Sequence, residues 1–412
     1  MTMIRTLLTI FLALTLFKIS NGQTLGFVIA DGKKRIEIPI QIQNNLVVVP
    51  VVLNDVLPLK FIADTGVQTA ILTQKAFSDI LQLPYSRKYS VSGPGGEKLI
   101  EAHVTNNVSI ALPGVTGKGH ALLVLEEDYL ELRNFLGTDV HGILGYELFS
   151  RFIVKIDYDK KVMTLIMPEK FHPRKKFQEI PMLVEDTKPF ILTALNLTAS
   201  NSMTAKLLMD TGASHGLLLE PSSDERIVVP SNTVSTVIGR GLGGVITGKT
   251  GRIESLKLGD YTLNNVLANF PDPNSYMDTL KSTLTFRHGT VGGEILSRFT
   301  VIFNYPQGKL YLKKNSEFKK KFYFNLSGID LKAKGSSLNV FEVMEVRKSS
   351  PADKAGVLMG DIIISVNGIV AKDLHLNEVN ALLNLKPGKK ISLVVERNKV
   401  RYQLIVRLEN QI

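Results

Sequence analysis

Two short stretches of the sequence decide the fold: Phe61-Ile-Ala-Asp-Thr-Gly-Val67 and Leu207-Leu-Met-Asp-Thr-Gly-Ala213. In each stretch an apolar run of strand length ends in Asp-Thr-Gly, and Asp210 follows Asp64 by 146 residues. The triplet alone is common in ordinary turns, because Asp side chains often bond to the backbone of a turn. Its recurrence after two similar strands is therefore the informative observation.

A second motif recurs with nearly the same offset. Gly142-Ile-Leu-Gly-Tyr-Glu-Leu-Phe-Ser-Arg-Phe152 returns 147 residues later as Gly289-Thr-Val-Gly-Gly-Glu-Ile-Leu-Ser-Arg-Phe299. Two unrelated motifs that recur in the same order and at almost the same spacing indicate an internal duplication. β-Branched, partly alternating runs such as 46–53 and 190–197 precede the Asp motifs, which predicts that both copies are mainly β-structure.

Each copy resembles one lobe of a retropepsin-like or pepsin-like aspartic peptidase. The resemblance rests on a strand that ends in Asp-Thr-Gly, a glycine-rich hairpin about thirty residues later and an apolar-apolar-Gly segment before a short helix. It implies a mainly β protein with two tandem retropepsin-like β-barrel lobes, arranged as a pepsin-like pseudo-dimer. We expect lobe 1 at 23–170 and lobe 2 at 180–315.

The resemblance makes Asp64 and Asp210 the catalytic pair, one from each copy. Two carboxyl groups a few ångströms apart cannot both stay ionised, so the pair shares a proton and offers a base and an acid to a peptide bond. Neighbouring hydroxyls are expected to bond across the lobes, and neighbouring glycines to allow close backbone approach. These supporting residues are Thr65, Gly66, Thr211 and Gly212.

The sequence departs from the family pattern after the first triplet. Val67 stands where the family usually has Ser or Ala, whereas Ala213 in the second copy fits. We expect this difference to make the surroundings of the two Asp residues unequal.

Glycine-rich stretches begin 29 residues after each of the two Asp residues. Glycine at a hairpin tip lets a loop close over a bound peptide, so the resemblance implies two flaps; ordinary turns are the alternative. The predicted flap residues are Gly93, Gly95, Gly96, Gly241, Gly243 and Gly244.

The last part of the chain, at 322–412, resembles a PDZ domain, an α+β fold. Ser350-Pro-Ala-Asp-Lys-Ala-Gly356 and Gly360-Asp-Ile-Ile-Ile-Ser-Val-Asn-Gly368 carry this resemblance. A PDZ groove binds a peptide C-terminus as an added strand and holds its carboxylate with backbone N–H groups. The alternative is a rigid clamp on the lobes. The positions that match the carboxylate loop are Leu326, Ser327, Gly328 and Ile329.

Composition limits the chemistry further. The 412 residues include 49 Lys and Arg against 38 Asp and Glu, seven scattered His and no Cys, for a net charge of +11. Thiol catalysis and thiolate metal sites are excluded, and the His residues lack ligand spacing, so we expect no metal and no cofactor. Basic residues concentrate at 170–177 and 313–321, and we interpret these two stretches as solvated linkers. Neither stretch carries a nucleic-acid-binding motif, so we expect no nucleic-acid partner.

Residues 1–22 have the pattern of a secretory signal peptide. Arg5 precedes twelve nearly unbroken apolar residues at 6–17, and small residues follow before Gln23. This run is shorter than the roughly 20 residues of a membrane-spanning helix, so we expect no stable membrane span after cleavage. The alternative is that the segment is not cleaved and anchors the protein to the membrane. Export without any Cys favours a secreted or periplasmic protein of the bacterial cell envelope.

These observations predict an exported aspartic-type endopeptidase that hydrolyses polypeptides, with a PDZ domain that binds substrate or partner C-termini. A monomer is expected, because one chain carries both Asp residues. The alternative is a catalytically inactive peptide-binding adaptor or chaperone with the same fold. A serine hydrolase, suggested by Gly212-Ala-Ser-His-Gly216, is disfavoured because Pro221 ends the segment that should form a helix.

Overall fold

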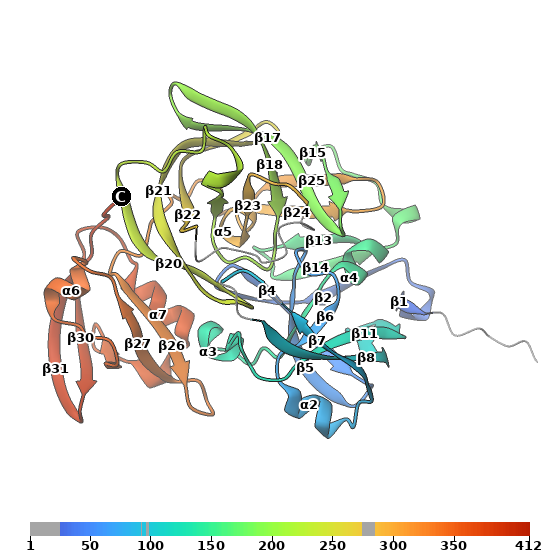
Figure 1. Ribbon diagram of the computed structural model, residues 1–412, viewed down its shortest axis with the longest axis horizontal. Coiled ribbons are helices and arrows are strands. Elements are labelled where there is room, and N and C mark those ends of the chain that lie inside the picture. The colour runs from blue at the N-terminus through green and yellow to red at the C-terminus, as the bar shows by residue number, and fades with distance from the viewer. Residues whose placement is uncertain (1–24, 92, 96–98, 274–284) are drawn as a thin grey trace, which may run out of the picture.

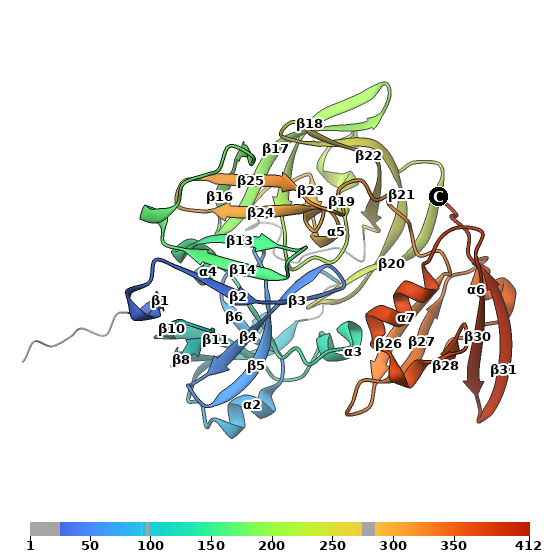
Figure 2. The same ribbon diagram turned by 180° about the vertical axis from the view of Figure 1, so that it is seen from behind.

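The computed structural model describes residues 25–91, 93–95, 99–273 and 285–412. The predicted signal peptide at 1–22 and the predicted flap residue Gly96 lie outside the described residues. Strands dominate and the helices are short (Figure 1, Figure 2), so the predicted mainly β fold class is confirmed. The barrel closure of each copy and the domain boundaries stay predictions.

Lobe 1, the part that contains Asp64, is built on one large sheet. Its strands lie in the order β3 (Gln41–Gln43), β4 (Leu46–Leu53), β5 (Leu57–Ala63), β12 (Gly142–Leu144), β6 (Ala70–Leu72), β11 (His120–Leu125), β8 (Ile100–Val108) and β7 (Tyr85–Val91), and β9 (Ile110–Ala111) pairs with β4. The helices of this lobe are α2 (Lys75–Ile80), α3 (Leu132–Leu136) and α4 (Tyr146–Arg151), and β1 (Gly26–Ile29) pairs with β10 (Val115–Lys118) beside the sheet.

Lobe 2, which contains Asp210, repeats this strand order. Its sheet runs β16 (Leu183–Glu185), β17 (Lys188–Thr198), β18 (Asn201–Met209), β23 (Gly289–Val291), β19 (Leu217–Leu219), β22 (Tyr261–Pro271), β21 (Gly244–Leu258) and β20 (Thr233–Gly241). In both lobes the strand before Asp-Thr-Gly pairs in parallel with the strand of the second motif. The duplication read from the sequence is therefore also a duplication of topology.

A six-stranded sheet joins the lobes. Its order is β15 (Gln178–Pro181), β25 (Lys309–Lys314), β24 (Phe299–Asn304), β13 (Ile153–Asp157), β14 (Val162–Ile166) and β2 (Arg35–Pro39). The central pair, β13 and β24, is antiparallel, and each strand begins where one copy of the second motif ends, at the fully buried Phe152 or Phe299. One hydrophobic core extends through both lobes, so they form a single packed body.

The C-terminal domain has its own sheet and core. The strands lie in the order β26 (Ile329–Lys334), β27 (Val340–Val346), β28 (Ile362–Val366), β30 (Lys390–Arg397) and β31 (Val400–Arg407), and β29 (Ile369–Val370) pairs with β28. Helices α6 (Pro351–Ala355) and α7 (Leu376–Leu383) lie beside this sheet, whereas α5 (Gly293–Leu296) belongs to lobe 2. Ser350 caps α6 by accepting a hydrogen bond from the Asp353 N–H, and Gly356 ends the helix in a left-handed conformation. The quoted motif thus specifies this helix locally.

The two lysine-rich stretches differ from the solvated linkers that the sequence predicts. Their lysines are largely exposed, but their aromatic residues pack on the lobes: Phe318 lies 5.4 Å from Phe299 between ring centroids. Phe322, which follows the second stretch, is buried in the core of the lobes. The second stretch therefore fastens the C-terminal domain to lobe 2.

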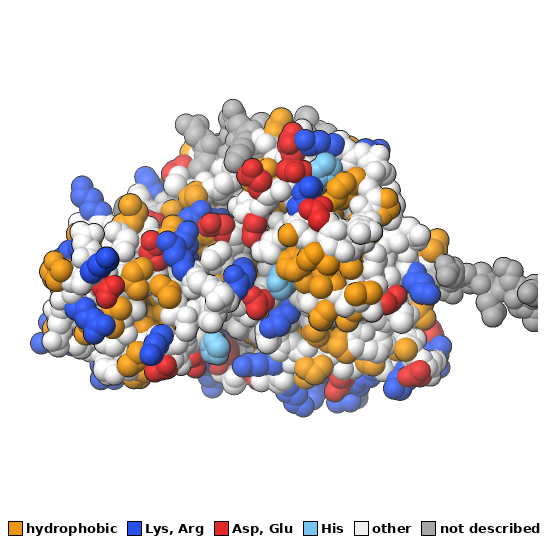
Figure 3. All heavy atoms as spheres, turned by 90° about the horizontal axis from the view of Figure 1, so that it is seen from below, with side chains coloured by type: hydrophobic (Ala, Val, Ile, Leu, Met, Phe, Trp, Pro, Cys, Tyr) orange, Lys and Arg blue, Asp and Glu red, His pale blue; other side chains and the backbone are white. Residues whose placement is uncertain are grey.

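The surface seen from below carries both signs of charge. Lys and Arg side chains lie between acidic and apolar ones and do not form one continuous patch on that face (Figure 3). Within the described ranges, which begin at residue 25, no helix is long and apolar enough to cross a membrane.

Candidate active site

The two sequence motifs together position each Asp residue. The Asp64 N–H donates to the carbonyl of Leu144 (2.9 Å), and the Asp210 N–H donates to the carbonyl of Val291 (2.9 Å). Each acceptor lies at the end of the strand that carries the apolar-apolar-Gly motif, so that strand holds the Asp backbone in place. Both motifs are therefore needed to form this turn: the first supplies the Asp residue, and the second supplies the carbonyl that accepts the Asp N–H.

Four hydrogen bonds join the lobes directly behind the carboxyl groups. The Thr65 hydroxyl donates to the carbonyl of Met209 (2.6 Å) and accepts from the Thr211 N–H (3.0 Å). The Thr211 hydroxyl donates to the carbonyl of Ala63 (2.8 Å) and accepts from the Thr65 N–H (3.1 Å). Both Thr side chains are fully buried, so this pattern fixes the spacing of the two turns.

Gly66 and Gly212 let the two carboxyl groups approach each other. Each Gly N–H donates to the Asp two residues earlier, at 2.6 Å to Asp64 Oδ1 and 2.8 Å to Asp210 Oδ1. A Cβ added to Gly66 would lie 3.1 Å from Asp210 Oδ2, and one added to Gly212 would overlap the Asp64 carboxyl. Each carboxyl group therefore packs on the glycine of the other lobe; a larger residue at 212 would displace the Asp64 carboxyl, and one at 66 would crowd both carboxyl groups.

The carboxyl groups of Asp64 and Asp210 are close neighbours, because the Cβ position of Gly66 lies 3.1 Å from both Asp64 Oδ1 and Asp210 Oδ2. Burial, and then the neighbouring Asp210 charge, raise the pKa of Asp64 well above its usual range, although the Gly66 N–H acts in the opposite direction. The pair therefore holds one proton at a pH at which an isolated Asp is ionised.

We expect this raised pKa to make the stability of the protein depend on pH. Protonated Asp64 favours the folded state, so its contribution is fully present below the unfolded pKa of about 3.9 and is lost as the pH rises through the higher folded pKa. As the pH rises, the free energy of unfolding of the wild type should therefore fall relative to that of Asp64→Asn, by at most about 1.4 kcal/mol per pH unit. Urea unfolding of both proteins between pH 4 and 7 measures the difference, and parallel pH profiles would contradict it.

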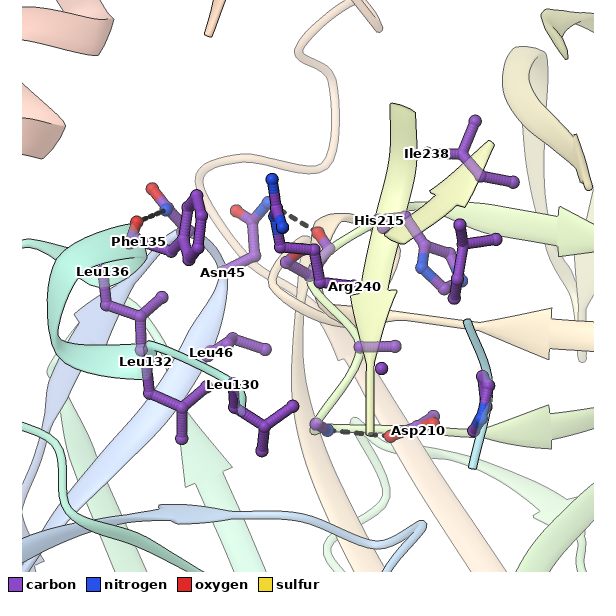
Figure 4. A pocket seen from close by; sticks show the side chains of 18 of the residues that line it. Asn45, Leu46, Leu130, Leu132, Phe135, Leu136, Asp210, His215, Ile238 and Arg240 are labelled. Carbon is purple, nitrogen blue, oxygen red and sulfur yellow. Dashed lines mark hydrogen bonds between the residues drawn. The ribbon is translucent and has the colours of Figure 1, made fainter. Parts of the chain in front are cut away.

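A cavity of about 860 Å³ contains the pair. Leu46, Leu130, Leu132 and Leu136 gather on the lobe 1 side, and Ile238 lies with His215 on the lobe 2 side (Figure 4). Apolar walls on both sides of two carboxyl groups suit an extended peptide with apolar side chains next to the bond that reacts.

The predicted flap glycines come together over this cavity. The Gly243 N–H donates to the carbonyl of Pro94 (3.0 Å), and a Cβ added to Gly95 would overlap the backbone of Gly244. Gly95 also has φ +114°, a conformation that favours glycine. The tips of the two hairpins thus touch each other, and Pro94 and Gly241 both line the cavity.

Replacing Gly241 with Ala should weaken peptide hydrolysis. The added methyl would overlap the Pro94 carbonyl, and such overpacking costs about 1–3 kcal/mol, so we expect kcat/KM to fall roughly tenfold. Gly239→Ala in the same strand is the matched control, because its nearest atom would be Ile246 Cδ1 at 3.7 Å. Steady-state kinetics of both variants test this, and equal values would show that the tip contact is dispensable.

Comparison with known proteins agrees with this geometry. Residues 49–148 and 196–286 match a family described as aspartyl protease, and residues 342–397 match a family described as PDZ domain. The two copies are therefore similar to the aspartyl protease family, and the C-terminal part is similar to a PDZ domain. The resemblance read from the sequence is confirmed for both parts, and the C-terminal domain is hereafter the PDZ domain.

Two curated proteins are similar to short segments of the chain. The carboxy-terminal processing protease CtpA of Bacillus subtilis (strain 168) is 46% identical over 50 residues, which are 12% of this chain and 11% of CtpA. Tight junction protein ZO-3 of Canis lupus familiaris is 36% identical over 76 residues, which are 18% of this chain and 8% of ZO-3. The chain thus spans only about a tenth of the length of these relatives.

Val67, the departure from the family pattern, keeps the backbone role of its counterpart. Its carbonyl accepts the Tyr146 N–H (2.9 Å), and the carbonyl of Ala213 accepts the Gly293 N–H (2.6 Å) in the same way. The Val67 side chain lies against an apolar cluster that includes Ile71, and the residue also lines the cavity. The substitution therefore changes the cavity wall and leaves the turn intact.

Sequence reasoning missed two polar residues beside the pair. His215 lines the cavity, and its buried Nε2 has no hydrogen-bond partner among the described residues; burial lowers its pKa to about 4, so the ring is neutral. The Tyr305 hydroxyl is likewise buried without such a partner, and burial and the charges of Asp64 and Asp210 raise its pKa. Tyr158 precedes Tyr305 by 147 residues, the same offset as in the second motif. This repeated Tyr is a sequence signal by which Tyr305 could have been found.

Ser214 lacks the geometry of a catalytic serine. It is exposed, and its carbonyl oxygen accepts a hydrogen bond from Asn45 Nδ2 (3.1 Å). Among the described residues no side chain is hydrogen-bonded to its hydroxyl as a base, and no group of three or more His, Cys, Asp or Glu side chains is arranged to hold a metal ion.

The predicted carboxylate loop of the PDZ domain already uses its backbone donors. The Leu326 N–H donates to Asn384 Oδ1 (2.6 Å), and the Gly328 N–H donates to Asn325 Oδ1 (2.9 Å). The Ile329 N–H donates to the Ser327 hydroxyl at 3.3 Å, in the same buried loop. Binding of a free C-terminus by this loop stays a prediction, and the carboxylate would have to displace side chains of the domain itself.

Proposed function

We propose that the chain is an aspartic endopeptidase that hydrolyses peptide bonds of extended polypeptides with Asp64 and Asp210. The observation that carries this proposal is the close approach of their carboxyl groups in a cavity that the two flap tips border: a Cβ added to Gly66 would lie 3.1 Å from both Asp64 Oδ1 and Asp210 Oδ2. Two carboxyl groups that share a proton offer a base and an acid at one place, which is the requirement for adding water to a peptide bond.

In the proposed mechanism Asp64 is the protonated member of the pair and Asp210 is the base; because the two carboxyl groups share one proton, these roles are exchangeable. Asp210 takes a proton from water while the water oxygen attacks the carbonyl carbon, and Asp64 donates its proton to the carbonyl oxygen. The tetrahedral diol collapses when Asp210 passes its proton to the amide nitrogen, Asp64 takes a proton from one diol hydroxyl, and the C–N bond breaks, which restores the starting protonation of the pair. The products are a carboxylic acid and an amine, and water is the only co-substrate.

The test is hydrolysis of an unfolded polypeptide by the purified chain, with mass spectrometry of the products. A peptide in which a secondary alcohol replaces the reacting carbonyl resembles the tetrahedral state and should inhibit competitively. Hydroxylamine should yield no hydroxamate, because water attacks directly and no acyl-enzyme forms. Hydroxamate formation would instead support a covalent mechanism, and peptide binding without hydrolysis would support the adaptor.

The proposal includes export and a monomeric active form. If 1–22 is a cleaved signal peptide, the mature protein begins at Gln23, which intact mass measurement on protein from the envelope or medium determines. Both carboxyl groups lie in one chain, so activity per mole of enzyme should not fall on dilution. A mass that includes 1–22 would contradict cleavage, and activity that falls on dilution would contradict the monomer.

A further inference from the structure

The cavity that contains Asp64 and Asp210 does not end at the lobes. Part of its lining comes from the PDZ domain, from the carboxylate loop, strands β26 and β27 and helix α7. The polar residues among them are Asn325, Asp330, Glu345, Asn380 and Asn384. A peptide bound at the carboxyl pair therefore shares its cavity with one face of the PDZ domain.

Helix α3 of lobe 1 holds this face in place. Asn134 Nδ2 donates to the carbonyl of Ala333 on β26 (2.8 Å), and Arg133 Nη2 donates to the carbonyl of Ser336 (2.6 Å). Strand β26 is the edge of the PDZ sheet, and both views place α3 beside it (Figure 1, Figure 2). A carbonyl that an added peptide strand would use is thus already bonded to lobe 1.

The same segment of lobe 1 also touches the other wall of the PDZ groove. A Cβ added to Gly137, directly after α3, would overlap the side chain of Leu376 at the start of α7. Residues 131–137 therefore contact both β26 and α7. A C-terminal peptide cannot lie along the whole groove unless this segment leaves.

The flap of lobe 2 contacts helix α3 at this place, next to the PDZ domain. Arg240 on β20 lies 4.3 Å above the ring of Phe135 in α3, and its charge acts on Asp330 of β26. Flap, helix and PDZ domain thus surround one part of the cavity, and Phe135 and Arg240 are seen together at its edge (Figure 4).

The chemistry of the PDZ part differs from that near the carboxyl pair. The PDZ part contributes all carboxylate side chains of the lining other than Asp64 and Asp210, namely Asp330 and Glu345, together with three amides and the apolar Ile329, Leu331 and Met344. Asp330 and Glu345 are paired residues on the antiparallel strands β26 and β27. Such oxygen atoms accept hydrogen bonds from the backbone N–H groups of an extended chain and from Lys or Arg side chains.

We propose that this PDZ face is a distal substrate subsite, which binds an internal polar or basic segment of the polypeptide some residues away from the reacting bond. The inference rests on the proposed function, whose apolar subsites lie at the carboxyl pair. The PDZ domain then acts as a fixed wall of the substrate cleft, and no free C-terminus is required.

The experiment compares two peptides on the full-length chain. The short peptide fills only the apolar subsites, and the long peptide carries the same sequence with eight polar and Lys-containing residues added at each end. The test variant combines Glu345→Gln with Asn380→Ala, because both residues line the cavity. The matched control combines Glu342→Gln on β27 with Asn377→Ala on α7, which do not line it.

We expect the test variant to raise KM for the long peptide about tenfold, the effect of losing one or two hydrogen bonds to a charged or amide group, and to leave the short peptide unchanged. The control variant should behave as the wild type with both peptides. Amidation of the long peptide's C-terminus should not change its KM. Equal effects on both peptides, no effect on either, or a tenfold loss on amidation would overturn the inference.

A binding measurement separates this inference from the proposed function. Fluorescence anisotropy with labelled long peptide gives Kd for the test and control substitutions on a chain that also carries Asp64→Asn. A tenfold weaker Kd in the test variant supports the subsite even when no peptide is hydrolysed, and an unchanged Kd refutes it. Absence of hydrolysis by the wild type refutes the endopeptidase alone.

Discussion

Replacing either Asp64 or Asp210 by asparagine should lower kcat for peptide hydrolysis by roughly 1,000-fold or more, because either amide removes the shared proton and with it the base and the acid. The shape of the side chain is kept, so the fold should remain. Hydrolysis of an unfolded protein, followed by mass spectrometry, measures the loss, with circular dichroism to check the fold.

Asp260→Asn is the matched control for this experiment. Asp260 lies in the exposed turn between β21 and β22, far along the strands from the carboxyl pair, so its substitution should leave activity unchanged. Activity near the wild-type value in both test variants would refute the aspartic mechanism. Loss confined to Ser214→Ala would replace it with a serine mechanism.

Removing one hydroxyl from the cross-lobe Thr pair should destabilise the protein strongly. In Thr211→Val the carbonyl of Ala63 loses its donor and the Thr65 N–H loses its acceptor, and both groups are buried. Each unsatisfied group costs about 1–3 kcal/mol, so we expect the free energy of unfolding to fall by roughly 2–5 kcal/mol. Urea unfolding measures this change, and kcat should fall as well because the carboxyl groups lose their fixed spacing.

Two further variants control for this effect. Thr211→Ser keeps the hydroxyl and should lose much less stability. Thr164 is also buried, but its hydroxyl has no hydrogen-bond partner among the described residues, so Thr164→Val should be neutral or stabilising. If Thr211→Val and Thr164→Val have the same stability, the cross-lobe hydrogen bonds do not hold the lobes together.

Local patterns in the sequence were sufficient to predict the fold class and the residues of the candidate site. Apolar strands that end in Asp-Thr-Gly, and a repeated Gly motif, predict two β copies, because strand periodicity and turn chemistry act over a few residues. The Ser350 cap and the Gly356 stop of α6 follow for the same reason. Comparison of two copies within one chain is what turned weak triplets into a predicted pair at Asp64 and Asp210.

Local sequence patterns, however, do not specify which residues far apart in the chain come into contact. The hydrogen bond from Asn134 to Ala333 joins residues 199 positions apart, and no periodicity marks either of them. His215 gave no signal because its lack of a partner depends on what surrounds it after folding. The lysine-rich stretches were interpreted from their charge, whereas the packing of Phe318 and Phe322 depends on a core assembled elsewhere in the chain.

The sequence by itself thus determined that this protein has two β copies, each with an Asp-Thr-Gly turn, followed by a PDZ domain. Only the tertiary structure decided that the Asp64 and Asp210 carboxyl groups lie next to each other, that the flap tips touch, and that the PDZ face lines the same cavity. The reason is physical: turns and strands form from neighbouring residues, whereas the depth of a cavity and the pKa of a buried acid depend on burial by residues far away in the chain.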